Sequence, residues 1–289
     1  MMGNFRFSTG SRSLALLFSA FLQASLLFSR PVFSQETPWV EVEARRFGFF
    51  ESLQRTQGLA TDQQGNVWYS ANQNMIRVKG FTGSTKATNS DPIPEELKRL
   101  GENHVGDIDV VSGFVFAPIE DGPKYQRPFV GIYTGSDLEL VKLLELSPEW
   151  LPDGIPWITA DLEHQTLITA QYNKTTRINL YDMRTGAALR QIPMSDMLDL
   201  IQGGKYFNNH LYMTANDPMG GHAIFDMDLM SGKVQKIIHL NDEIVEVEGL
   251  AYLANSQVSA DNPSISDFFV LGVAGSGLKK RMVLYHWKR

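Results

Sequence analysis

The sequence predicts an all-β repeat protein, a β-propeller with five blades of four antiparallel strands, and three observations support this class. A short apolar strand, a turn and an aromatic or β-branched strand recur five times along the chain. The recurrences are 46 to 51 residues apart, which is the length of a propeller blade. The two ends of the chain supply strands that can complete one blade together. One anchor residue marks each repeat, and the anchors are Gly58, Gly106, Trp157, Gly203 and Gly249.

The outer half of each repeat has a recurring pattern as well. Residues 129–133 lead through a Gly-Ser-Asp turn to residues 138–146, and residues 223–228 lead through Met-Ser-Gly to residues 234–238. A strand, a turn with glycine or polar residues and a second strand form the pattern of a β-hairpin. Each repeat therefore contains two hairpins, which together give four antiparallel strands.

The chain ends are expected to close the ring. Residues 282–287 have the pattern of a third strand of the fifth blade, and residues 39–47, which alternate apolar and charged side chains, would add the fourth. Closure removes exposed strand edges. Residues 91–100 favour a short helix, and residues 195–201 favour one further helical turn. Two alternatives remain open: a β-sandwich with accidental spacing, and a ring of six blades if residues 81–103 hide irregular strands.

The beginning of the chain has the pattern of a cleaved export signal. Arg6 and Arg12 precede an apolar stretch over residues 14–28, and the residues that follow place a cleavage site before Gln35. The apolar stretch is too short for a normal transmembrane helix. An uncleaved amphipathic anchor is the alternative interpretation.

The expected organisation is a signal peptide at residues 1–34 and a β-propeller domain at residues 35–289 in a secreted or periplasmic protein, which we expect to be a monomer. Removing the signal leaves 23 basic and 32 acidic side chains, a net charge of −9. This acidity argues against a nucleic-acid partner. No later stretch is apolar enough to span a membrane, which argues against membrane association after signal removal. The chain has no cysteine, which excludes disulfides and thiolate metal sites.

Propeller geometry predicts where a site would form. The innermost strand of each blade begins beside the central channel, so the residues flanking the five anchors converge there. Acids and amides are oxygen ligands of the kind that Ca²⁺ prefers, and Asp107 and Glu248 are the expected metal ligands. The alternative is that these groups only cap strand ends and bond to neighbouring blades. The predicted ligand-binding residues are Gln57, His104, Asp107, Trp157, Gln202, Glu246 and Glu248.

Register sharpens this prediction. Gln57, Asp107, Gln202 and Glu248 each lie next to an anchor, so we expect them to cluster at the same end of the channel. His104 precedes Asp107 by an odd number of residues, and the two side chains would face opposite sides of one continuous strand, which argues against a catalytic pair. The remaining histidines fall in turns or outer strands and are expected to be surface or packing residues: His164, His210, His222, His239 and His286.

Two segments resemble known families. Thr-Gln-Gly-Leu at residues 56–59, followed by Trp-Tyr-Ser at residues 68–70, resembles the first-blade motif of the plant and bacterial type of glutaminyl-peptide cyclotransferase, a secreted five-bladed propeller. Glu-Gly-Leu-Ala-Tyr at residues 248–252 is similar to inner-strand motifs of that family and of SdiA-regulated or phytase-like propellers. The sequence departs from the cyclotransferase pattern at residues 106–108, where Gly-Asp-Ile replaces an early Glu-Gly-Leu. The resemblance implies the fold, export and a site at the channel mouth.

Two functions of different classes follow from these patterns. The favoured one is an exported propeller that binds a small molecule, glycan or protein partner at the mouth of its central channel, because no ordered catalytic motif is present and this fold hosts many functions. The alternative is a metal-dependent hydrolase, lactonase or cyclase with its site at the same channel. An open pocket over the converging side chains would favour the enzyme, whereas a plugged channel is compatible with a binding protein.

Overall fold

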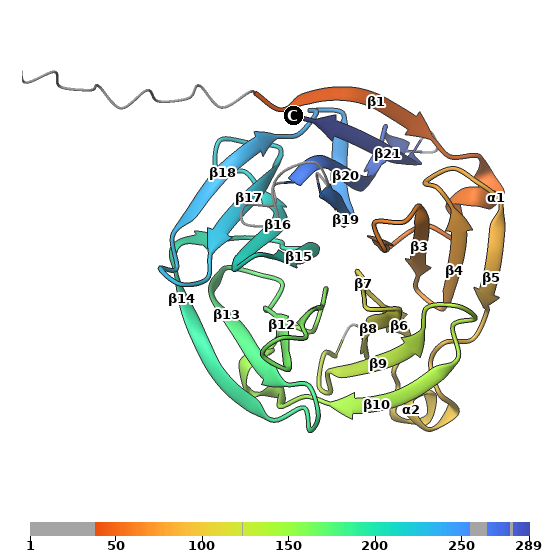
Figure 1. Ribbon diagram of the computed structural model, residues 1–289, viewed down its shortest axis with the longest axis vertical. Helices are drawn as coiled ribbons and strands as arrows, with labels where there is room; N and C mark the ends of the chain where they lie inside the picture. Colours follow the sequence, from red (N-terminus) through yellow and green to blue (C-terminus); the bar gives the residue numbers. More distant parts are fainter. Residues whose placement is uncertain (1–37, 123, 255–264, 278–279) are drawn as a thin grey trace, which may run out of the picture. The chain divides into compact units, whose positions relative to one another are not determined.

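The protein forms five antiparallel sheets arranged in a ring around a central axis (Figure 1). This arrangement confirms the prediction of a five-bladed β-propeller. The sheets belong to one compact unit, Pro38–Arg289. The predicted signal peptide and its cleavage site lie outside the residues that the computed structural model describes, which are 38–122, 124–254, 265–277 and 280–289.

The blades follow the chain, with the first strand of each at the channel and the last at the rim (Figure 1). The first blade contains β2 (Gly58–Thr61), β3 (Asn66–Ala71), β4 (Asn74–Lys79) and β5 (Thr85–Asn89). The second contains β6 (His104–Val105), β7 (Asp109–Val111), β8 (Phe114–Glu120), β9 (Phe129–Thr134) and β10 (Leu140–Glu145). The third contains β11 (Thr159–Asp161), β12 (Thr166–Thr169), β13 (Thr175–Asp182) and β14 (Ala188–Leu198). The fourth contains β15 (Gly203–Phe207), β16 (His210–Asn216), β17 (His222–Asp228) and β18 (Val234–His239).

The fifth blade joins the two ends of the described chain. Its strands are β19 (Ile244–Ala254), β20 (Ile265–Ala274), β21 (Arg281–Lys288) and β1 (Val40–Arg46). The outermost strand, β1, pairs antiparallel with β21 from Val40 opposite Lys288 to Arg46 opposite Val283. The predicted closure of the ring by the beginning of the chain is therefore confirmed.

The anchor glycines are required because neighbouring inner strands approach each other closely. A Cβ atom on Gly58 would lie 2.8 Å from the backbone nitrogen of Ile108, and one on Gly106 would lie 2.2 Å from the carbonyl oxygen of Pro156. Distances this short exclude any side chain. The glycine repeat of the sequence thus reflects backbone contact between adjacent blades around the axis.

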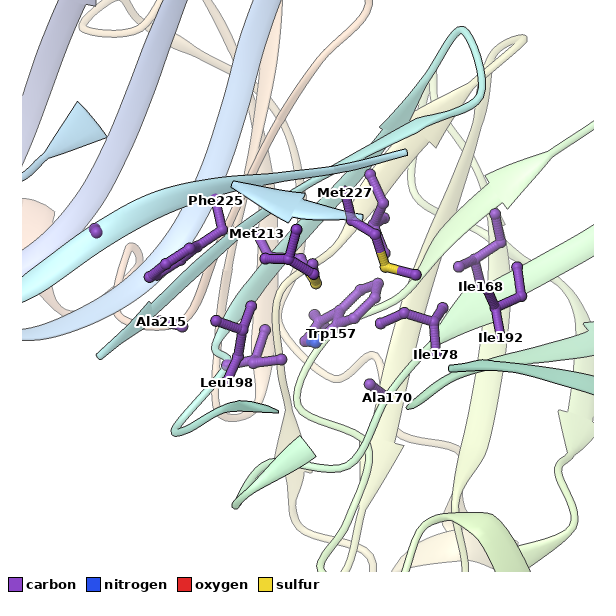
Figure 2. Packing of buried hydrophobic residues seen from close by; sticks show 14 of the residues in the cluster. Trp157, Ile168, Ala170, Ile178, Ile192, Leu198, Met213, Ala215, Phe225 and Met227 are labelled. Carbon is purple, nitrogen blue, oxygen red and sulfur yellow. The ribbon is translucent and has the colours of Figure 1, made fainter. Parts of the chain in front are cut away.

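The third blade carries Trp157 at its anchor, and this side chain is packed into the core. It is fully buried in a cluster that includes Ile168 and Met213 (Figure 2). A Cβ atom on Gly204 of the fourth blade would lie 2.2 Å from the indole ring. Trp157 therefore fills the space between the third and fourth blades, which a glycine leaves open for it.

The predicted helical turn at residues 195–201 is wrong. These residues begin within β14, and the backbone nitrogen of Ser195 donates to the carbonyl oxygen of Gly232 at 2.9 Å, so the strand end is held by the next blade. The helix expected at residues 91–100 is confirmed. Residues 81–103 contain β5 and this helix instead of a sixth blade. The helices of the described chain are α1 (Phe49–Ser52), α2 (Glu95–Leu100) and the 3₁₀ turn η1 (Pro148–Trp150).

Within the described residues, no helix is both long and apolar enough to cross a membrane.

Candidate functional site

A polar pocket of about 220 Å³ lies at the channel mouth where the inner strands begin, and we call it the channel-mouth pocket. Five of the seven predicted ligand-binding residues line it, and they come from four blades. The third blade contributes the segment that precedes its inner strand. The lining residues are Gln57, His104, Glu120, Tyr125, Asp153, Pro156, Tyr172, Gln202, Glu246 and Glu248.

His104 is held by partners on both ring nitrogens. Its Nδ1 donates to Glu120 Oε1 at 2.9 Å, and its Nε2 lies 2.8 Å from Gln57 Oε1. Glu120 also accepts a hydrogen bond from the backbone nitrogen of Ile155 at 2.6 Å. The imidazole is therefore oriented by a carboxylate of its own blade and an amide of the first blade. Asp107, three residues after it in sequence, is not among these partners.

Loops that precede the third blade's strands complete the pocket wall. Asp153 accepts a hydrogen bond from the backbone nitrogen of Tyr172 at 2.9 Å, which fixes the loop that carries this tyrosine. Gly154, at φ +102°, passes so close to Glu120 that a Cβ atom would lie 2.2 Å from the carboxylate. The second blade adds Tyr125 from the loop between β8 and β9, and this residue has φ +51°, an uncommon conformation for a bulky residue.

β19 contributes two acids through irregularities in its pairing. Register shifts occur immediately before Glu246 and across Glu248. A β-bulge of this kind re-aims the side chain that it carries. Glu246 is exposed and accepts a hydrogen bond from Gln202 Nε2 at 3.3 Å. Glu248 is only 6% exposed, and no donor among the described residues bonds to it.

Burial and like charges shift the acid–base behaviour of this pocket. Burial, followed by the charges of Glu246 and Asp107, holds the pKa of Glu248 well above its ordinary value. Burial, followed by the charges of Glu246 and Glu248, raises the pKa of Tyr172 to about 12. Both shifts have the same physical origin, because each group would be charged in a poorly solvated place beside other negative charges.

Asp107 lies deeper on the axis and forms a buried ion pair. Its Oδ2 accepts from Lys205 Nζ at 2.6 Å, and its Oδ1 accepts from the backbone nitrogen of Leu59 at 2.9 Å. Lys205 also donates to the carbonyl oxygens of Ile108 at 2.9 Å and Gly204 at 3.2 Å, so all three of its protons have acceptors. Both side chains are about 1% exposed or less. This ion pair joins inner strands of three blades.

Asp107 and Glu248, the expected metal ligands, lie in different surroundings. Both oxygens of Asp107 are used by Lys205 and by Leu59. Among the described residues, no three histidine or acidic side chains are arranged to hold a metal ion. Trp157 does not reach the pocket either, because its ring is buried between blades and Pro156 lines the wall in its place.

A second and larger cavity of about 940 Å³ lies at the opposite mouth, among the turns that follow the inner strands. Its acids other than the exposed Glu163 are already bonded to the chain. Asp62 accepts from the backbone nitrogens of Gln64 and Asn66, and Asp161 accepts from His164 Nδ1. These carboxylates stabilise the turns, so the smaller channel-mouth pocket is the stronger candidate for a site.

A groove of about 540 Å³ adjoins the channel-mouth pocket, because Tyr172, Gln202 and Glu246 line both cavities. The groove extends to His222, a histidine expected from the sequence to be a surface or packing residue. Burial lowers the pKa of His222. The two cavities together give a site with a deep polar end and a longer, more open end.

Sequence reasoning missed Lys205 and five residues of the pocket, one of which, Pro156, directly precedes the anchor Trp157. Lys205 could have been noticed in the sequence. Aligning the repeats on their anchors places it with Ala60, Ile108, Thr159 and Ala251, none of which is charged, so a lysine there required an explanation. The other four residues left no signal, because the second strand and the loops that carry them have no fixed register to the anchor. They are Glu120, Tyr125, Asp153 and Tyr172.

The fold and the pocket define a five-bladed β-propeller with a polar cavity at one mouth of its central channel. No family model matches the chain, and no curated protein matches it. It is similar to the solved structure of Kuenenia stuttgartiensis hydrazine synthase, with a TM-score of 0.43 and 11% identity over 80% of this chain and 60% of that one. It is also similar to the WD40 β-propeller domain of Doa1, with a TM-score of 0.44 and 9% identity over 88% of this chain and 97% of that domain. Similarities this distant carry no argument about function.

Proposed function

We propose that this protein is an exported β-propeller that binds a small molecule in the channel-mouth pocket. One observation carries the proposal: polar side chains converge on a pocket whose buried acid, Glu248, has no donor among the described residues. A purely structural acid would be bonded to the chain, as buried polar groups generally are. A small molecule is favoured over a glycan or a protein partner, since only a group that enters a cavity of about 220 Å³ reaches Glu248.

Export is the second part of the proposal and depends on the pattern of residues 1–34. N-terminal sequencing of the protein recovered outside the cytoplasm should begin near Gln35. A full-length product that stays in the cytoplasm would contradict this part of the proposal.

Binding at the channel mouth can be tested with a small-molecule library and calorimetry. We expect the screen to find ligands that bind the Gln202→Leu variant at least about tenfold more weakly than wild type, because the amide of Gln202 lines the pocket. Gln64→Leu is the matched control, since Gln64 lies at the opposite mouth. Ligands that respond only to the control substitution would move the site to the opposite mouth, and a library without any ligand would contradict the proposal.

A further inference from the structure

The titratable side chains that line the channel-mouth pocket are four acids, two tyrosines and His104. Four acids line it, whereas no lysine or arginine does. Glu120 and Asp153 already accept hydrogen bonds from the backbone. Glu246 and Glu248 keep unused acceptor capacity, because Glu246 receives one bond and Glu248 none from the described residues. A ligand that complements this pocket must bring hydrogen-bond donors and positive charge.

The burial of Glu248 is a second, independent observation that points to a ligand. The side chain is 6% exposed, and the charged groups that act on it most strongly are Glu246 and Asp107, both acids. The nearby cation of the axis, Lys205, has all three of its protons committed elsewhere. The Glu248 carboxyl group lines the pocket and receives no donor or counter-charge from the described residues, so a molecule that supplies both would be bound favourably there.

We propose that the channel-mouth pocket binds the protonated primary amine of a small molecule, whose ammonium group donates to Glu248 and Glu246. The inference rests on the proposed function and specifies its ligand class. A primary ammonium group carries three N–H donors, whereas a quaternary ammonium group carries none and would leave the carboxylates unpaired. Tyr125 and Tyr172 in the pocket wall also favour a cation, because aromatic rings attract positive charge.

The size of the two cavities sets the shape of the ligand. A volume of about 220 Å³ equals roughly seven water molecules at about 30 Å³ each, enough for an ammonium group on a short carbon chain. The adjoining groove of about 540 Å³ shares Tyr172, Gln202 and Glu246 with the pocket. The remainder of a longer amine would follow this groove toward His222.

A series of probes that differ in charge tests the inference. Calorimetry in a buffer without primary amines compares n-butylamine with 1-butanol, butyrate and tetramethylammonium. We expect n-butylamine to bind at least about tenfold more tightly than each of the other three probes. Glu248→Gln should reduce n-butylamine binding by about tenfold or more, whereas Glu163→Gln, an exposed acid at the opposite mouth, should not change it. If Glu248→Gln does not fold, Glu246→Gln replaces it.

The alternative outcomes separate this inference from the proposed function. Binding of 1-butanol or butyrate as tightly as n-butylamine, and its loss in Gln202→Leu, would overturn the amine inference and leave the pocket as a small-molecule site. A rise of the melting temperature with CaCl₂ that disappears in Glu248→Gln, without any effect of n-butylamine, would make the pocket a metal site instead. Failure of n-butylamine to bind would also overturn the inference, while the library screen decides the proposed function by itself.

Discussion

Two buried carboxylates lie beside anchor glycines and differ in their partners. Asp107 follows Gly106 and is 1% exposed, and Glu248 precedes Gly249 and is 6% exposed. Asp107, in the second blade, accepts hydrogen bonds from Lys205 of the fourth blade and from the backbone of Leu59 in the first blade. Glu248 accepts none from the described residues, and its surroundings are acidic.

Both acids are buried, so their hydrogen-bond partners are what distinguish Asp107, a structural acid, from Glu248, the candidate functional acid. Asp107 is committed to joining inner strands around the axis, so it has no acceptor left for a ligand. Glu248 is directed by a bulge into a cavity and keeps both oxygens available. Burial raises the pKa of both acids, to about 7 for Asp107, so the free acceptor oxygens of Glu248, and not the perturbed pKa alone, mark it as the candidate for a binding site.

Breaking the buried ion pair between Lys205 and Asp107 should have the largest effect on the free energy of unfolding. Lys205→Met leaves Asp107 buried without its cation, so we expect unfolding in urea to show a loss of about 3–5 kcal/mol. Lys98→Met is the matched control, because Lys98 and its partner Asp91 are 36% and 66% exposed, and its loss should stay below about 1 kcal/mol. Equal losses for the two variants would show that the axial ion pair is not a structural element of the ring.

We expect a smaller effect of pH on the free energy of unfolding. It arises from buried acids that have no hydrogen-bond partner in the fold. Glu102 is 2% exposed, neither carboxylate oxygen has a partner among the described residues, and burial followed by the charge of Asp121 raises its pKa to about 7. The folded state therefore holds this proton more tightly than the unfolded chain, where the pKa is about 4.3. Its contribution to stability is complete below about pH 4 and is lost as pH rises through about 7.

The raised pKa of Glu248 acts in the same direction. Urea unfolding between about pH 5 and about pH 8 should show a fall in stability on the order of 2 kcal/mol, and Glu102→Gln should flatten the curve. The curve of Asp62→Asn serves as the control, because this carboxylate is bonded within its turn and is only half-buried. A wild-type curve that rises over this range would contradict the assignment of unpartnered acids.

Much of the fold could be predicted because the anchors record a geometric requirement. Gly58 and Gly106 recur where neighbouring backbones touch, so their spacing reports the blade directly. The closure of the ring by β1 could be predicted as well, since alternating side chains identify an outer strand. The end of β14 could not, because its conformation depends on Gly232 of the next blade.

Residues of the candidate site could be predicted only where they have a set position relative to the anchor of their repeat. Gln57, Gln202 and Glu248 flank anchors, and the structure brings them to one pocket. Asp107 also flanks an anchor but follows it, and its side chain turns toward Lys205 on the axis. Trp157 occupies the anchor position and fills the core. The pocket's loop residues depend on how connecting segments fold back over the channel, which no periodicity in the sequence reports.

The smallest expected effect tests the central claim most directly, namely that the fold uses Asp107 and leaves Glu248 for a ligand. The melting temperatures of Asp107→Asn and Glu248→Gln are compared with wild type, without ligand, at about pH 8, because a higher pH favours the ionised form of both acids. We predict opposite outcomes: Asp107→Asn is destabilised because Lys205 loses its partner, whereas Glu248→Gln is unchanged or stabilised by about 1 kcal/mol because an unpaired charge is removed. If Glu248→Gln lowers the melting temperature as much as Asp107→Asn does, Glu248 is a structural acid and the account is contradicted.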